Sequence, residues 1–365
     1  MTSDSERLDW IRLARTHGIG PVSFFQLIRR YGSASAALDA LPDLSARSRK
    51  GRPLQPPERH LVEQELNAAN RYGARLVLSS EPDYPPLLND LEPPPPVLTL
   101  LGRADLASRP TVAIVGARNA SAAGRKIARD MAAELGRNGF TIVSGLALGI
   151  DGEAHAASIE TGTIAVLGGA IDHVYPPQHK RIYAEVAASG LIVSESPFGY
   201  RAKAQDFPRR NRIITGMSLG VVVVEAAERS GSLISARVAG EQGREVMAVP
   251  GSPLDPRAAG TNSLLHQGAT LVRHADDVLD ILATLDRRQV CAPPPRPFEF
   301  DPEAGEPSES ELHRVLEALS PHPMPIDEIA RASGLPASRC AAVLLELELS
   351  GEAQTLPGGL AAKAF

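Results

Sequence analysis

DFPRRNRIITGMSLGVVVVE, residues 206–225, joins a cluster of basic side chains to a run of β-branched residues. The run Leu219–Val224 is apolar without alternation, which is typical of a parallel strand buried on both faces. Within and just before the stretch, one acid, Asp206, accompanies five bases: Arg201, Lys203, Arg209, Arg210 and Arg212. The whole chain has a formal net charge of −5, so the cluster is local and makes a polyanion the first candidate ligand. A solvated helix face is the alternative interpretation.

The composition predicts a globular cytoplasmic protein with roughly two or three domains in its 365 residues. Hydrophobic residues make up 43% of the chain and charged residues 22%, which is enough for a sizeable core. No apolar run approaches the roughly 20 residues of a membrane span, and the N-terminus lacks a secretory signal pattern. The two cysteines, Cys291 and Cys340, lack the spacing of metal ligands, so we expect neither a disulfide framework nor a metal site.

From residue 111 onward, short apolar strands alternate with helical stretches. This alternation predicts right-handed βαβ units and a parallel sheet with helices on both faces, a Rossmann-like α/β fold. Ligands of such sheets bind at the carboxyl ends of the strands. The predicted strands are Thr111–Gly116, Phe140–Ser144, Thr163–Leu167, Leu191–Ser194, Leu219–Val224, Val246–Val249 and Ala269–Val272, preceded by Arg75–Leu78 and Val97–Leu101.

Smaller segments flank this core. Residues 1–72 are expected to form a helical domain in which Pro21 opens the second helix after the turn HGIG. This pattern resembles a sterile-alpha-motif-like or helix-hairpin-helix unit, and a structural αα-hairpin is favoured over one that holds a DNA phosphate. The remaining segments are a core domain over 73–288, a proline-rich linker over 289–308 and a winged-helix domain over 309–365.

The winged-helix segment is poorly equipped to bind DNA. Its expected recognition helix, PASRCAAVLLELELSG (residues 336–351), has Arg339 as its only base, alongside Glu346 and Glu348. Because phosphate contacts need positive charge, a packing or protein-contact role is favoured over DNA reading.

Small and basic residues follow several core strands. Ser230-Gly231-Ser232 opens a helix directly after a strand, where free amides and the helix dipole favour an anion. Together with Arg209, Arg210 and Arg212, these loops predict one basic pocket that spans several phosphates. The loop residues of this pocket are Gly116, Arg118, Gly145, Lys180, Ser230, Gly231 and Ser232.

Other ligand classes fit less well. The chain has no GxxxxGK[ST], and its first core loop lacks GxGxxG, so P-loop nucleotides and nicotinamide cofactors are not expected. An enzyme remains the alternative, because Asp151 and His155 lie four residues apart in one helix and Glu225 ends a strand. Such an enzyme would be a nucleotide hydrolase that acts on a phosphorylated sugar. The other interpretation of Asp151 is a helix N-cap.

Taken together, these residues resemble the DprA/Smf family of DNA-processing proteins. The resemblance covers about 170 residues in the family's order. It rests on VGARNAS (115–121), SGLALGIDGEAH (144–155), GTIAVLGGAIDHVYP (162–176), FPRRNRIITGMS (207–218), SGSLISARVA (230–239), VPGSP (249–253) and GTNSLLHQGA (260–269).

The resemblance implies a non-catalytic protein that binds single-stranded DNA and loads the RecA recombinase onto it during natural transformation. It also implies a homodimer formed through the Rossmann-like domain. Arg118 matches the arginine of the family's GSR/GAR turn, Arg210 and Arg212 lie in its FPxRNRII motif, and Lys180 lies near its basic position after the YP turn. Phe207 and Tyr175 adjoin these bases and are candidate platforms for unstacked bases.

Two expectations follow for variants. Because Arg209 and Arg210 are adjacent, they should point to different sides, and Arg210 is the one predicted to face DNA. Arg118→Ala and Arg210→Glu are therefore each expected to weaken oligonucleotide binding while leaving the fold intact.

Overall fold

The computed structural model describes residues 3–46, 54–289, 307–356 and 359–364. The chain divides into two compact units, one comprising residues 1–64, 92–96 and 294–365 and the other residues 65–91 and 97–293. Most of the predicted linker over 289–308 lies outside the described residues. The predicted domain boundaries stay predictions.

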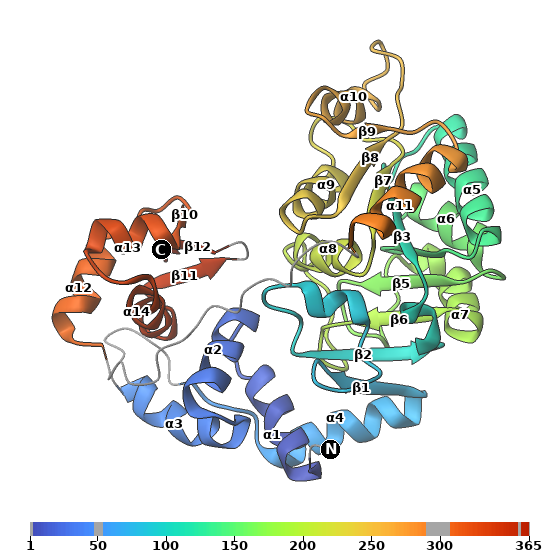
Figure 1. Cartoon of the computed structure of the whole chain (residues 1–365). Helices are drawn as coiled ribbons and strands as arrows, with labels where there is room; N and C mark the ends of the chain where they lie inside the picture. Colours follow the sequence, from blue (N-terminus) through green and yellow to red (C-terminus); the bar gives the residue numbers. More distant parts are fainter. Residues whose placement is uncertain (1–2, 47–53, 290–306, 357–358, 365) are drawn as a thin grey trace. The chain divides into compact units, whose positions relative to one another are not determined.

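The second unit is built on a nine-stranded sheet (Figure 1). Its strand order is β1-β2-β6-β5-β4-β3-β7-β8-β9, and only the pairs β1–β2 and β2–β6 are antiparallel. The strands are β1 (Ala74–Leu78), β2 (Val97–Gly102), β3 (Thr111–Val115), β4 (Thr141–Ser144), β5 (Thr163–Leu167), β6 (Leu191–Ser194), β7 (Gly220–Val223), β8 (Glu245–Ala248) and β9 (Thr270–Leu271). The expected Rossmann-like parallel core is confirmed.

Helices cover both faces of this sheet, and β7 shows why its residues are apolar throughout. Val221 and Val223 belong to one core cluster with α8 and α9, whereas Val222 and Val224 belong to another with α5 and α11. Alternate residues of a strand point to opposite faces, so a strand covered on both sides has no polar face. The helices of this unit are α5 (Ala122–Arg137), α6 (Ile150–Ser158), α7 (Lys180–Ser189), α8 (Asp206–Gly216), α9 (Gly231–Glu241), α10 (Ala259–His266) and α11 (Ala275–Gln289).

The first unit is mostly helical. Its helices α1 (Asp4–Ala14), α2 (Pro21–Tyr31) and α3 (Ala34–Ala46) pack around Phe24 and Leu27. The next helix, α4 (Arg59–Tyr72), begins in the first unit and ends in the second. Pro21 is the first residue of α2, as predicted, and Gly32 ends that helix with a φ of 80° in the left-handed region.

A winged-helix fold completes the first unit, as the sequence predicted. Its strands pair in the order β10-β12-β11, all antiparallel. Its elements are α12 (Glu309–Ala318), β10 (Met324–Pro325), α13 (Ile326–Ser333), α14 (Ala337–Leu349), β11 (Ala353–Leu356) and β12 (Leu360–Lys363).

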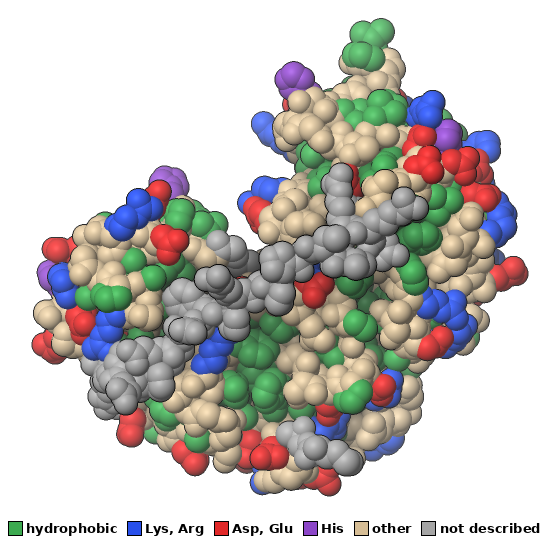
Figure 2. All heavy atoms as spheres, viewed as in Figure 1, with side chains coloured by type: hydrophobic (Ala, Val, Ile, Leu, Met, Phe, Trp, Pro, Cys, Tyr) green, Lys and Arg blue, Asp and Glu red, His purple; other side chains and the backbone are tan. Residues whose placement is uncertain are grey.

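The surface seen in Figure 2 mixes acidic and basic side chains, with no large area of a single sign. No helix among the described residues has both the length and the apolar character needed to cross a membrane.

Candidate nucleic-acid interface

A cavity of about 890 Å³ opens beyond the carboxyl ends of β3 and β7. These strands are neighbours in the sheet, but the chain continues from β3 toward β4 on one side and from β7 toward β8 on the other. Such a switch point leaves a crevice between diverging loops, where open α/β sheets bind their ligands. We call it the switch-point cavity. Residues 116–119 after β3 and Arg229–Ser232 after β7 form two of its walls.

The switch-point cavity is positively charged. Four arginines line it, whereas Asp151 is the only acid among the lining residues. The arginines are Arg118, Arg210, Arg229 and Arg257. Arg118 and Arg229 are exposed, and the Arg257 guanidinium lies 2.9 Å from Asp255. A cavity with basic walls therefore lies at these strand ends. It includes Arg118 and Arg210 of the predicted pocket, whereas Arg229 and Arg257 were not predicted to belong to it.

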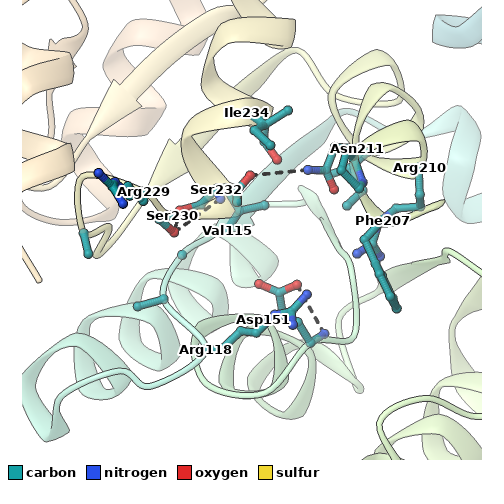
Figure 3. A pocket seen from close by; sticks show the side chains of 18 of the residues that line it. Val115, Arg118, Asp151, Phe207, Arg210, Asn211, Arg229, Ser230, Ser232 and Ile234 are labelled. Atoms are coloured by element: carbon teal, nitrogen blue, oxygen red, sulfur yellow. Dashed lines mark hydrogen bonds between the residues drawn. The ribbon is translucent and has the colours of Figure 1, made fainter. Parts of the chain in front are cut away.

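The first turn of α9 forms one wall of the cavity. Ser230 is the N-cap, and its hydroxyl oxygen accepts a hydrogen bond from the amide of Ser232. Gly231 and Ser232 also line the cavity, so the positive end of the helix dipole faces it. In Figure 3, Ser230 and Ser232 lie across the cavity from Phe207. Asn211 joins this wall to α8, because its side-chain amide donates to the carbonyl of Gly231 over 3.4 Å.

Aromatic rings form another part of the wall. The ring centroids of Tyr175 and Phe207 are 5.4 Å apart, and both residues line the cavity. The Arg118 guanidinium lies 5.6 Å from the centroid of the Phe207 ring. Tyr175 is 54% exposed despite its size. The exposed Tyr175 ring therefore lies next to the Phe207 ring, which the Arg118 guanidinium approaches. Such a group of rings and a cation is a suitable platform for an unstacked base.

Arg210 lies on α8 and is buried, contrary to the expectation that it faces a ligand directly. It is 7% exposed, and its Nη1 donates to the carbonyl of Gly145 over 2.7 Å and to that of Val166. Burial lowers the pKa of Arg210 to about 10, while the Asp151 carboxylate opposes this decrease, so the guanidinium remains charged at neutral pH. Arg210 therefore lines the cavity with only a small exposed surface and supplies positive charge there. Because it is buried and bonded, the expectation that Arg210→Glu leaves the fold intact no longer holds.

Gly145 also differs from its predicted role. Its amide donates to Asp151 Oδ2 over 3.1 Å, and the amide of Ala147 donates to the same oxygen over 3.3 Å. The prediction that Gly145 offers a free amide to an anion is therefore wrong. Asp151 is the second residue of α6, and Gly149, not Asp151, is the N-cap of that helix. By accepting both amide hydrogen bonds, the Asp151 carboxylate fixes the conformation of the β4–α6 loop beside Arg210.

Gly145→Ala should lower the stability of the protein by about 1–3 kcal/mol, because a Cβ here needs space that Arg210 occupies. A Cβ at position 145 would lie 2.4 Å from Arg210 Nη1. Chemical denaturation measures the change. Gly240→Ala is the matched control, because its added Cβ meets nothing within 4 Å and alanine favours the helix. Equal stability of the two variants would contradict the packing argument.

Three predicted bases lie outside the switch-point cavity. Arg212 pairs with Glu195, and both side chains are largely buried, at 13% and 17% exposure. Arg209 is exposed, and its Nε lies 3.7 Å from the same carboxylate. Lys180 is exposed at the start of α7, next to His179, which lines a smaller cavity of about 470 Å³. Arg118 and Asn119 line both cavities, so the GAR turn separates them.

The residues considered for catalysis have structural partners. Glu225 accepts hydrogen bonds from the amide and the hydroxyl of Ser121 and so holds the start of α5. His155 is fully buried and bonds Thr163 Oγ1 through Nδ1 over 2.8 Å, and burial lowers the pKa of His155 to about 3. The described residues contain no group of three or more His, Cys, Asp and Glu side chains that could hold a metal ion.

Comparison with known proteins gives consistent matches along the whole chain. Family models described as DprA-like N-terminal HHH domain, DNA recombination-mediator protein A and DprA winged helix domain match residues 4–68, 75–283 and 299–359. Protein Smf of Synechocystis sp. is 33% identical over 395 residues, covering 98% of each chain. DNA processing protein DprA of Bacillus subtilis is 42% identical over 220 residues, which are 60% of this chain and 74% of that one.

Two solved structures are similar as well. DNA processing protein A from Streptococcus pneumoniae matches with a TM-score of 0.66 and 33% identity, covering 74% of this chain and 97% of that one. DNA processing protein A from Helicobacter pylori, whose structure describes a single-stranded DNA binding mode, matches with a TM-score of 0.53 and 28% identity over 59% and 96% of the two chains. Sequence, fold and domain order all agree, and the chain belongs to the DNA recombination-mediator protein A family, the DprA/Smf family.

Proposed function

We propose that this protein binds single-stranded DNA in the switch-point cavity. The observation that carries the proposal is the combination of four arginines with an aromatic pair, the exposed Tyr175 and the half-buried Phe207, at the ligand-binding edge of the sheet. The single-stranded DNA binding mode described for the Helicobacter pylori relative supports it. Single strands present spaced phosphates and unpaired bases, which this combination matches.

Each part of the cavity has a distinct task in this proposal. Arg118 and Arg229 are exposed and bind phosphate oxygens, for which the guanidinium fork is well shaped. Tyr175 and Phe207 stack on bases that leave the strand axis. The buried charge of Arg210 raises the potential within the cavity without contacting the strand.

We propose further that the protein acts as a recombination mediator that loads RecA onto the bound strand, and that it works as a homodimer through its Rossmann-like domain. Membership of the recombination-mediator family supports the first part. Oligonucleotide-dependent assembly of RecA filaments, with and without this protein, tests it. Sedimentation of the purified chain tests the dimer.

The binding proposal is tested by comparing single- and double-stranded oligonucleotides of one sequence across salt concentrations. We expect the single strand to bind more tightly, and its affinity to fall steeply with salt because phosphate binding releases counterions. Equal affinity for both forms at every salt concentration would contradict the proposed base contacts.

Tyr175→Ala should weaken oligonucleotide binding by about 1–3 kcal/mol, the usual contribution of one base stacked on an aromatic ring. Tyr175 is 54% exposed, so the change should leave the stability of the fold nearly unaltered. Fluorescence anisotropy with a labelled oligonucleotide measures the affinity. Tyr175→Phe is the control, because it keeps the ring and should keep the affinity. If Tyr175→Ala binds the oligonucleotide as tightly as the parent protein, Tyr175 does not stack on a base.

A further inference from the structure

Helix α14, which occupies the position of the recognition helix in the winged-helix fold, has two apolar faces. Val343, Leu344 and Leu347 belong to the core of the winged-helix fold itself. Leu345 and Leu349, which are 3% and 6% exposed, belong instead to the core cluster of the N-terminal helices. With 3.6 residues per turn, these two sets point in opposite directions from the helix axis. A helix that is apolar on opposite faces must be covered on both.

The N-terminal helices supply that second cover. Leu345 and Leu349 share one cluster with Phe24, Leu27 and other apolar side chains of α1–α3. These residues all belong to the same compact unit of the chain. The face of α14 that lies away from the winged-helix core is therefore occupied.

A charged pair beside the two leucines joins α14 to α2. Glu346 lies 3.6 Å from the guanidinium of Arg30, and the two side chains are 13% and 16% exposed. Glu348 accepts a hydrogen bond from Thr355 of β11, within the winged-helix fold itself. An apolar stripe beside a complementary charged pair is typical of a specific interface.

The same helix lacks what DNA reading needs. Arg339, its only base, is held by Glu311 of α12, with Nε 2.8 Å from Oε1 and both side chains largely buried. The helix therefore offers no free cation to a phosphate, and all of its residues are buried or half-buried.

We propose that the winged-helix domain does not read duplex DNA through α14 but uses this helix to hold the N-terminal helical domain of the same chain. The helix that enters the DNA groove in other winged-helix proteins is here a docking element. This inference is independent of the function proposed for the switch-point cavity.

A charge-reversal cycle in the full chain tests the docking. We expect Arg30→Glu and Glu346→Arg each to accelerate amide hydrogen exchange in α2 and α14 by about threefold to tenfold, because like charges then meet at a partly buried site. The double variant Arg30→Glu/Glu346→Arg should restore the slow exchange. Arg29→Glu is the matched control, because this neighbouring arginine of α2 is exposed and its reversal should change nothing.

Leu345→Glu provides a second test that leaves the winged-helix core alone. It should release α14 from α2 and speed exchange in both helices, whereas exchange in α12 and α13 should stay slow. Unchanged exchange in α2 and α14 for both Leu345→Glu and Glu346→Arg would overturn the docking. A loss of duplex DNA binding in Arg339→Ala, measured by gel shift with the full chain, would overturn the claim that α14 does not read DNA.

Discussion

Replacing Arg210 by methionine is expected to destabilise the protein by about 3–5 kcal/mol, the usual consequence of removing one partner from a buried charged group. The guanidinium donates to the carbonyls of Gly145 and Val166, and its charge opposes the desolvation of Asp151. Methionine keeps the apolar stem but leaves both carbonyls without this donor and the carboxylate without its nearest positive charge. Chemical denaturation measures the loss.

Two further variants make this prediction specific. Arg209→Met changes the adjacent residue on α8, whose side chain is 58% exposed, and should alter stability by well under about 1 kcal/mol. Asp151→Asn in the Arg210→Met background should recover part of the loss, because it removes the unbalanced buried charge. If Arg210→Met unfolds at the same denaturant concentration as Arg209→Met, the buried role of Arg210 is wrong.

The pH dependence of the Arg210→Met variant follows from Asp151. Burial raises the pKa of Asp151, and Arg210 acts against that rise. Without Arg210, the folded-state pKa should therefore lie further above the unfolded value. A carboxyl with a raised folded pKa binds protons more readily in the folded state, so its stabilising contribution is present at acid pH and lost as the pH rises through the folded pKa. The stability gap between Arg210→Met and the parent protein should thus narrow as the solution is acidified.

Arg118→Ala is expected to weaken oligonucleotide binding by about 1.5–3 kcal/mol, the usual contribution of a hydrogen bond to a charged group. Arg118 is exposed on the turn that separates the two cavities, and it lies 5.6 Å from the centroid of the Phe207 ring. Its removal should leave stability unchanged. Arg118→Lys should recover part of the affinity, because lysine restores the charge but not the planar fork. Anisotropy titrations at fixed salt measure all three proteins.

The sequence predicted the sheet well because each buried strand is a short apolar run that can be recognised by itself. Val221–Val223 are fully buried on both faces, as the continuous β-branched run indicated. Arg118, Ser230 and Ser232 were also predicted to lie at the site, because they follow strands whose carboxyl ends must share one edge.

Burial of single arginines was not predictable in the same way. Arg209, Arg210 and Arg212 are nearly adjacent in the sequence, but α8 turns them in different directions, so Arg210 is buried and Arg209 is exposed. The basic residues alone do not indicate at which residue α8 begins, so the sequence did not show which way each arginine points. Arg229 directly precedes Ser230, so its place at the cavity could have been predicted from the sequence. Arg257 reaches the cavity from a loop before α10, and no pattern in that loop indicates a binding site.

The salt dependence of oligonucleotide affinity tests the central claim, that the switch-point cavity binds single-stranded DNA, most directly. The logarithm of the association constant is measured against the logarithm of salt concentration for the parent protein, Arg118→Ala and Arg237→Ala. Arg237 lies on α9, is 70% exposed and does not line the cavity, so its loss controls for general charge. We expect the slope for Arg118→Ala to be shallower than that of the parent by about 0.7, the value for one lost phosphate contact on a single strand, and the slope for Arg237→Ala to equal that of the parent. Identical slopes for all three proteins, or an equal change in both variants, would contradict the account.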